Sequence, residues 1–304
     1  MKRFIPLIIL VVLLGAFLVY KNIGFRDANK SSKLQVSASF YPLYFFSSQI
    51  GGIKADVYNV TPAGSEPHDY APTTRDIARI ENGNMLVLNG GVEAWADRVR
   101  VNLEGTDVRV IIAGKDLLSK QFVEEGAVQK DPHIWLNPEL AKKQVAKIVE
   151  GYIAIDSKNS AYYKNNQQLL DQKLDQLDQQ YRDGLKSCQT RNIVTSHAAF
   201  AYLAEQYGLT QIAISGLSPD EEPSARQLAS ASNFAKENNV QYIFFESLIS
   251  PKLSETIASE VGAKTLTLDP IEGIADNDIK QGKDYFTVMQ QNLKSLQLAL
   301  QCSI

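Results

Sequence analysis

The sequence predicts an α/β protein of two (β/α)4 lobes, each with a four-stranded, parallel-type sheet, joined by a long rigid backbone helix. In the first and last parts of the chain, short apolar runs of strand length alternate with stretches of helical spacing. This alternation is typical of βαβ units and parallel sheets. Between them, helical spacing continues without a strand from about residue 139 to residue 186. A length of 304 residues also favours two domains.

Residues 34–150 are expected to form the first lobe. Its first strand is predicted at 34–40, where the sequence alternates and is rich in Val and Ser, and further strands are predicted at the compact β-type runs 57–60, 85–88 and 108–112. Its helices are predicted at 42–50, 73–82 and 92–101. Thr73 and Thr74 offer an N-cap to the second of these helices.

Two helices follow the first lobe. The first is amphipathic, covers Glu139–Tyr152 and starts after Pro138, a common position for proline. The second is predicted from Ser157 to about Lys186, and some 30 residues of helix would span about 45 Å. A coiled coil is the alternative, but two to three heptads are too few to sustain one. We therefore expect residues 151–186 to be the rigid connection between the lobes.

Residues 187–304 are expected to form the second lobe. Its strands are predicted at 192–195, 211–214, 241–245 and 265–268, and its helices at 197–207, 224–238, 252–261 and 282–300. Four strand–helix units in each lobe indicate a structural duplication, although no sequence repeat is visible.

Residues 1–33 are predicted to be a signal peptide or an N-terminal membrane anchor followed by a short linker. Basic Lys2 and Arg3 precede the apolar run Phe4–Tyr20, which is the order of an export signal. The run is also at the short limit for a membrane-spanning helix, which needs roughly 17–25 residues. A buried core helix is the remaining alternative. The body of the protein is thus expected to be periplasmic or tethered to the outer face of the cytoplasmic membrane.

The composition allows a sizeable core and excludes one class of partner. Hydrophobic residues make up 44% of the chain and charged residues 21%, which is ordinary for a globular protein. The net charge is −3, the pI is about 5.7, and no basic run stands out. A chain with this charge and without a basic run would not neutralise the phosphates of a nucleic acid, so nucleic acid is not an expected partner.

The two cysteines are predicted to form a disulfide. A single pair in an exported chain, Cys188 and Cys302, suggests a bridge between the C-terminal helix and the start of the second lobe. The alternative is a pair of free thiols that bind metal, but C-x-x-C spacing is missing.

The three histidines are the main functional signal. In open α/β sheets the ligand site lies beyond the carboxyl ends of the strands. His197 and Asp269 each come just after a predicted strand of the second lobe, whereas His68 and His133 lie in loops beyond strands of the first. Two potential metal ligands from each lobe are therefore expected to meet in the cleft between the lobes.

The chemistry of this set favours zinc. Three neutral imidazoles and one carboxylate suit Zn²⁺ in near-tetrahedral geometry at about 2.0–2.2 Å. Cu²⁺ and Ni²⁺ would bind it too, whereas a Mn²⁺ site would carry more carboxylates. Glu246, also at a strand exit, is either a fifth ligand or a group that holds an imidazole by its other nitrogen. Asp269 before Pro270 has an alternative role in starting a turn. Trp135 is expected to pack in the core.

Several segments resemble one known family. These segments, Gly64–Thr73, Asp131–Pro138, Thr195–Phe200, Gly216–Ser224 and Leu268–Pro270, are similar to motifs of the zinc- and manganese-binding substrate-binding proteins of ABC transporters, cluster A-I. The resemblance runs from about Leu34 to the C-terminus. Asp131-Pro132-His133-Ile134-Trp135-Leu136-Asn137-Pro138 is its most specific part.

The resemblance implies two lobes joined by a rigid helix, with the metal in their interface. It implies a non-catalytic carrier that captures Zn²⁺, or alternatively Mn²⁺, and delivers it to an ABC permease. His197 matches the zinc branch of the family, because the manganese branch usually has Glu there. Three features depart from the pattern: Ala71 replaces a more usual acidic residue, Ala113–Lys130 contains no histidine-rich loop, and no lipid-anchoring cysteine follows the apolar segment.

Two other function classes remain. An exported zinc hydrolase would need an open metal position, but H-E-x-x-H is missing and Asp269 would fill the fourth position. An adhesin role is not distinguished by the sequence. If histidines bind the ion, affinity should weaken below about pH 6, because only neutral imidazole binds metal.

Overall fold

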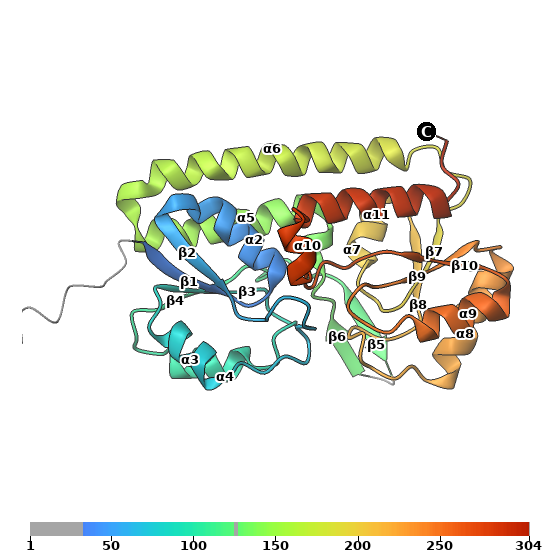
Figure 1. Cartoon of the computed structure of the whole chain (residues 1–304), viewed down its shortest axis with the longest axis horizontal. Coiled ribbons are helices and arrows are strands. Elements are labelled where there is room, and N and C mark those ends of the chain that lie inside the picture. Colours follow the sequence, from blue (N-terminus) through green and yellow to red (C-terminus); the bar gives the residue numbers. More distant parts are fainter. Residues whose placement is uncertain (1–32, 125–126, 304) are drawn as a thin grey trace, which may run out of the picture.

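The computed structural model describes residues 33–124 and 127–303, in which two β/α lobes lie end to end beneath one long helix (Figure 1). The predicted export segment, Phe4–Tyr20, lies outside these residues. Within the described ranges, no helix combines the length and the apolar character needed to cross a bilayer.

The first lobe is built on a parallel sheet with strand order β2-β1-β3-β4. Its strands are β1 (Leu34–Ala38), β2 (Ala55–Asn59), β3 (Met85–Leu88) and β4 (Arg109–Ile112), and its helices are α2 (Tyr41–Gly51), α3 (Thr74–Glu81), α4 (Ala96–Asn102) and α5 (Pro138–Ile155). All four residues of β3 are buried, as expected of a strand covered on both faces. The predicted cap is confirmed, since Thr73 and Asp76 form a capping box at α3.

The second lobe repeats this architecture. Its strands are β7 (Asn192–Thr195), β8 (Thr210–Ala213), β9 (Tyr242–Phe245) and β10 (Lys264–Thr267), parallel in the order β10-β9-β7-β8. Counted within each lobe, both sheets have the order 2-1-3-4. The helices are α7 (Ala201–Tyr207), α8 (Ala225–Glu237), α9 (Lys252–Val261), α10 (Asp276–Lys280) and α11 (Tyr285–Ala299).

The connecting helix α6 covers Ser160–Gly184 and runs along both lobes (Figure 1). It has 25 residues, which corresponds to about 37 Å, and is shorter than predicted because a separate 3₁₀ turn, Ser157–Asn159, precedes it. It packs against α2 and α5 of the first lobe and α11 of the second. Its buried stripe contains Tyr163, Leu170, Leu174, Leu177 and Tyr181.

One hydrophobic core runs through both lobes on the α6 side. The ring of Phe46 on α2 lies 5.0 Å, centroid to centroid, from that of Tyr285 on α11, in an edge-on arrangement. Trp135, between the lobes, belongs to the same cluster. Because packed cores resist deformation, the contact between the lobes is expected to allow little hinge motion.

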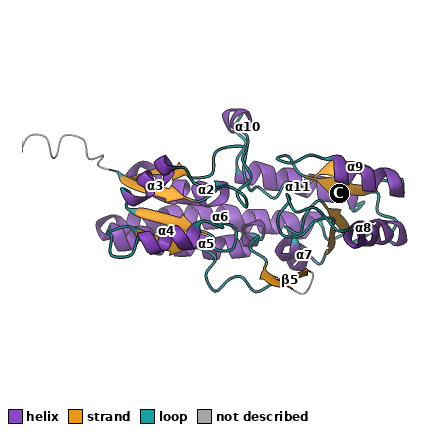
Figure 2. Cartoon of the chain, turned by 90° about the horizontal axis from the view of Figure 1, so that it is seen from below, coloured by secondary structure: helices purple, strands orange, loops and turns teal. Residues whose placement is uncertain are grey.

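A hairpin between the lobes was not predicted. Strands β5 (Gln121–Glu124) and β6 (Ala127–Lys130) pair antiparallel (Figures 1 and 2). They escaped prediction because four-residue strands of mixed polarity carry little periodic signal. The hydroxyl of Tyr202 on α7 accepts from the Lys120 amide at 3.0 Å and donates to the Asp131 carbonyl at 3.1 Å. These bonds fix the base of the hairpin, and with it Asp131, to the second lobe.

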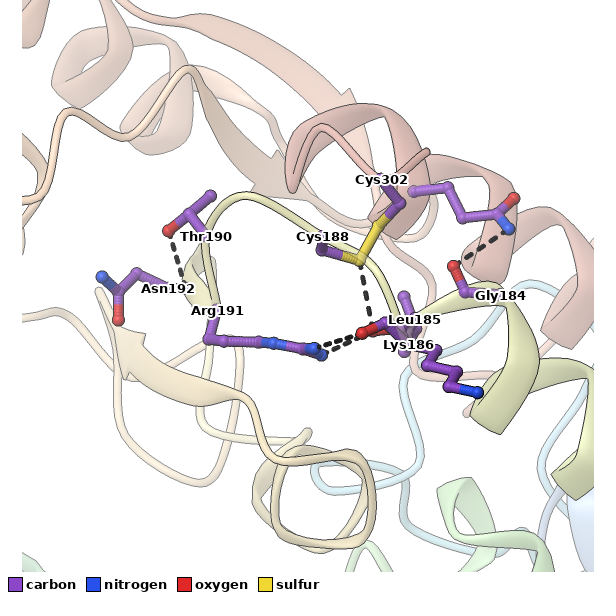
Figure 3. Close-up of a disulfide and its surroundings, with 9 residues drawn as sticks. Gly184, Leu185, Lys186, Cys188, Thr190, Arg191, Asn192 and Cys302 are labelled. Atoms are coloured by element: carbon purple, nitrogen blue, oxygen red, sulfur yellow. Dashed lines mark hydrogen bonds between the residues drawn. A yellow bond between two sulfur atoms is a disulfide. The ribbon is translucent and has the colours of Figure 1, made fainter. Parts of the chain in front are cut away.

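The predicted disulfide between Cys188 and Cys302 is confirmed (Figure 3). It joins the segment after α6 to the segment after α11, across 114 residues of sequence. The Arg191 guanidinium, which donates to the carbonyls of Leu185 and Lys186 at 2.6 and 3.0 Å, supports the same turn. The C-terminal helix is thereby tied to the end of the connecting helix.

Candidate metal centre

Four loops at the junction of the lobes supply the candidate ligands. His68 lies in the loop between β2 and α3, and His133 directly precedes a 3₁₀ turn, Ile134–Leu136. His197 follows β7, and α7 begins four residues later than His197 instead of at it, so His197 is a loop residue. Glu272 lies in the loop after β10. Each lobe contributes two side chains.

The three imidazoles converge on one carboxylate oxygen. Oε1 of Glu272 lies 3.2 Å from Nε2 of His68, 3.1 Å from Nε2 of His133 and 3.5 Å from Nε2 of His197. The Nε2 atoms of His133 and His197 are 3.4 Å apart. All four ligand atoms lie within 4.8 Å of one another.

The four separations of 3.1, 3.2, 3.4 and 3.5 Å are close to those around a tetrahedral ion. Ligand atoms about 2.0–2.1 Å from Zn²⁺ at tetrahedral angles stand about 3.3 Å from each other. The side chains of His133, His197 and Glu272 are at most 1% exposed, and that of His68 is 9% exposed. The second oxygen of Glu272, Oε2, is buried without a hydrogen-bond partner among the described residues. The donor set can therefore hold one ion in a nearly closed site.

Two further carboxylates orient two of the imidazoles. Nδ1 of His133 lies 2.8 Å from Oδ1 of Asp131, and the His133 amide donates to the same oxygen at 2.9 Å. Nδ1 of His197 is paired with Oε1 of Glu246, which also accepts from the Ser196 hydroxyl. A proton on Nδ1 leaves the lone pair on Nε2, where an ion would sit. Glu246 thus stands behind His197 and outside the group of four.

The electrostatics reflect this mutual pairing. Burial lowers the pKa of His133, but the carboxylates of Asp131 and Glu272 outweigh burial and raise it above its usual value. Burial also lowers the pKa of His197, but the carboxylates of Glu246 and Glu272 have the larger effect and raise it well above its usual value. For Glu272, burial raises the pKa, but the surrounding histidines lower it well below its usual range. These ligands form a compact charge-paired cluster.

Asp269, predicted as the fourth ligand, does not join this cluster, and Glu272 stands there instead. The Asp269 carboxylate accepts from the Ser247 hydroxyl and, at 2.7 Å, from the backbone amide of Ile271. Burial raises its pKa to about 6, against the opposing effect of these two hydrogen bonds. Its side chain thus organises a turn, which is the alternative role that the following Pro270 had indicated.

Glu272 was not among the predicted candidates because the strand-exit rule favours the first carboxylate after a strand. Glu272 comes five residues after the end of β10, beyond Pro270. The available signal was a second carboxylate in the same loop, only three residues beyond Asp269. Glu66 lies in the same region as the cluster, and burial and the neighbouring Glu272 raise its pKa to about 9.

Comparison with known proteins places the chain in a family. The sequence profile described as "Zinc-uptake complex component A periplasmic", or ZnuA, matches residues 36–299. The chain belongs to this family. The high-affinity zinc uptake system protein ZnuA of Bacillus subtilis is 39% identical over 284 residues, which cover 90% of this chain and 89% of that protein.

Solved structures of similar proteins share the fold. Zn(II)-bound AdcA from Streptococcus pneumoniae matches with a TM-score of 0.77 and 38% identity, covering 88% of this chain but only 58% of AdcA. The laminin-binding protein Lmb of Streptococcus agalactiae, reported as a bifunctional protein with adhesin and metal transporting activity, matches with a TM-score of 0.79 and 32% identity. That match covers 88% of this chain and 99% of Lmb.

Proposed function

We propose that this ZnuA-family chain is an extracytoplasmic solute-binding protein that captures Zn²⁺ between its lobes and delivers it to an ABC permease for import. His68 and His133 of the first lobe and His197 and Glu272 of the second are the proposed ligands. Mn²⁺, or another divalent metal, is the alternative cargo of the same carrier. Residues 34–150 and 187–304 are the proposed metal-binding lobes.

The observation that carries the proposal is the convergence of three imidazole nitrogens and one carboxylate oxygen at tetrahedral spacing. Catalytic zinc sites have three protein ligands and keep a fourth position for water. Here four protein side chains supply a complete set, and most of it is buried. Such a site suits binding and release of an ion better than hydrolysis, so the chain is proposed to be non-catalytic.

The donor atoms also favour zinc as the cargo. Three nitrogens and one oxygen form a borderline-soft set, whereas Mn²⁺ prefers carboxylate, carbonyl and water oxygens. The B. subtilis relative is named for zinc uptake, and the AdcA structure is reported with Zn(II) bound. Both of these relatives are thus associated with zinc, in agreement with the three histidines of the proposed donor set.

The proposed location is the outer side of the cytoplasmic membrane. The family description includes the word periplasmic, and the Cys188–Cys302 disulfide is typical of oxidising compartments. The apolar segment Phe4–Tyr20 would direct export and then be either removed or retained as an anchor. In that location the protein would meet its permease at the membrane surface.

Elemental analysis tests the proposal. The purified chain is equilibrated with equal concentrations of Zn²⁺, Mn²⁺ and Cu²⁺, freed of unbound ion by dialysis, and measured for bound metal. We expect one zinc per chain, lost in His68→Ala and His197→Ala. Preferential binding of manganese would show that the cargo is Mn²⁺ and would leave the proposed carrier function standing. A chain that retains no metal would refute the proposal.

A further inference from the structure

The turn that carries Glu272 into the site is held from both lobes. The backbone of Asp269 is bound twice by Asn292 on α11: its amide donates to the Asn292 side chain at 2.8 Å, and its carbonyl accepts at 2.6 Å. The Ile271 amide donates to the Asp269 carboxylate at 2.7 Å. Across the junction, the indole N–H of Trp135 donates to the Pro270 carbonyl at 2.7 Å. The main chain before Glu272 is thus fixed at successive residues.

This turn adopts a conformation that its own sequence disfavours. Ile271 has a φ of 59°, in the left-handed region, and its side chain is fully buried. A β-branched residue rarely adopts this conformation, because its side chain crowds the backbone. Such conformations persist only where the surrounding contacts enforce them. The hydrogen bonds to Pro270 and Ile271 are therefore needed to keep Glu272 directed at the histidines.

Trp135 connects the two halves of the metal centre. It lies two residues after His133, and Pro270 lies two residues before Glu272. Its own carbonyl accepts from the Tyr285 hydroxyl of α11 at 2.6 Å. Trp135 is thus bonded to the second lobe through both its main chain and its side chain. Any shift of the turn relative to His133 must break or stretch the indole hydrogen bond.

We propose that Trp135, together with Asp269, is a positioning residue that holds the Glu272 turn against the histidines and so sets the affinity and geometry of the metal centre. The inference rests on the proposed function and deepens it. Trp135 touches no ion in this scheme and acts through Glu272. Its ring also packs edge-on against Phe40, with centroids 4.9 Å apart, so packing must be separated from hydrogen bonding in the test.

The chain offers a matched control for this separation. Its other tryptophan, Trp95, is also buried, but its indole nitrogen has no hydrogen-bond partner within the described part of the chain. Trp95→Phe and Trp135→Phe remove the same atoms from buried positions, and only the second removes an indole hydrogen bond. Asp269→Ala, which removes the acceptor for Ile271 from the other side of the turn, gives a second and independent disturbance.

The experiment measures zinc affinity and the visible absorption of bound Co²⁺ in each full-length variant. Loss of groups that orient metal ligands typically costs about 10–100-fold in affinity. We expect a loss in this range for Trp135→Phe and for Asp269→Ala, and none for Trp95→Phe. We also expect the Co²⁺ spectra of the two affected variants to shift toward that of Glu272→Gln, because the carboxylate no longer reaches the ion.

A double-mutant cycle with Glu272→Gln decides whether Trp135 acts through Glu272. If it does, adding Trp135→Phe to Glu272→Gln lowers affinity by less than about threefold further. An undiminished additional loss would show that Trp135 acts elsewhere, for example on His133, and would overturn the inference. Wild-type affinity and spectrum in Trp135→Phe and Asp269→Ala would overturn it as well and leave the proposed function intact. Failure of the wild-type chain to bind zinc or cobalt would refute both.

Discussion

The carboxylate of Glu272 in the candidate metal centre offers the most direct test of the structure. Glu272→Gln and Asp269→Asn form a matched pair, since both replace a carboxylate by an amide of the same shape. In the first variant a proposed ligand loses its charge among three imidazoles. In the second, the amide oxygen can still accept from Ile271, and its NH₂ group can donate to the Ser247 hydroxyl. Only the first substitution should therefore disturb the ion.

The expected difference is large. Structural zinc sites contribute about 10–16 kcal/mol, so each of four ligands supplies roughly 3 kcal/mol. A loss of about 3 kcal/mol raises the dissociation constant by more than a hundredfold. Glu272→Gln keeps a carbonyl oxygen near the ion, so we expect the loss to be about 100-fold and not much greater. Asp269→Asn should change affinity by less than about threefold, because its hydrogen bonds are replaceable.

Competition with a chromophoric zinc chelator at neutral pH measures both dissociation constants, and thermal unfolding of each metal-free variant checks that the fold is retained. If Asp269→Asn weakened zinc binding as much as Glu272→Gln did, or more, Asp269 would be the ligand and our assignment of the carboxylates would be wrong. Unchanged binding in Glu272→Gln would equally remove this side chain from the site.

Three further predictions concern the site and the scaffold. The raised pKa values of His133 and His197 mean that protons should still compete with zinc above about pH 6.5. Zinc affinity should therefore continue to rise with pH above about pH 6.5 and should fall steeply below about pH 6. A zinc affinity that stayed constant between about pH 5 and pH 8 would contradict histidine ligation. His133→Ala should lower zinc affinity by more than about 100-fold, because it removes a proposed ligand. Glu246→Ala should lower it by about 10–100-fold, because Glu246 only pairs with Nδ1 of His197. Equal losses of affinity in isothermal titration would contradict this difference in role. Cys188→Ser with Cys302→Ser should lower the free energy of unfolding in urea by up to about 4–5 kcal/mol and leave zinc stoichiometry unchanged; a lost ion would instead link the bridge to the site.

The pH prediction has a counterpart in the metal-free protein. A histidine with a raised pKa in the folded state stabilises the fold below its unfolded pKa of about 6.5, and this stabilisation is lost as the pH rises through the folded pKa. His133 and His197 should therefore make the metal-free chain less stable as the pH rises above about 6.5. Zinc binding strengthens over the same window, because the protons that stabilise the metal-free cluster are those the ion displaces.

The fold was predictable because its signals are local and repeated. Apolar runs such as Met85–Leu88 and the buried stripe of α6 are set by periodicity, which survives in a single sequence. The three histidines were predictable for a related reason: they lie in loops beyond strand ends, where the geometry of parallel sheets brings ligands together. Those expectations needed no knowledge of individual side-chain contacts.

The carboxylate of the candidate centre could not be identified without that knowledge. Asp269 and Glu272 lie in one loop, and adjacency to the strand favours the first of them. Ile271, which lies between them in the left-handed conformation, separates the two side chains. Asp269 is bonded to Ser247 and Ile271, whereas Glu272 lies against the histidines. A positive φ at a β-branched residue is imposed by distant contacts, here with Trp135, and no local propensity predicts it. The hydrogen bond of Trp135 was missed for the same reason.

The duplicated scaffold does not produce a duplicated site. Both sheets have the same strand order, and the serine after the first strand of each lobe donates to a buried glutamate, Ser39 to Glu93 and Ser196 to Glu246. The next residue, however, is Phe40 in the first lobe and His197 in the second. The candidate ligands thus occupy non-equivalent positions of a symmetric framework, which explains why the two lobes show no repeat of the ligand motifs in their sequences. Since the core that joins the lobes is continuous, we expect the ion to reach the site by local loop movement on the side of His68, the most exposed of the four side chains. A rigid junction then serves affinity, because ligands held in place by the fold lose little freedom when the ion binds.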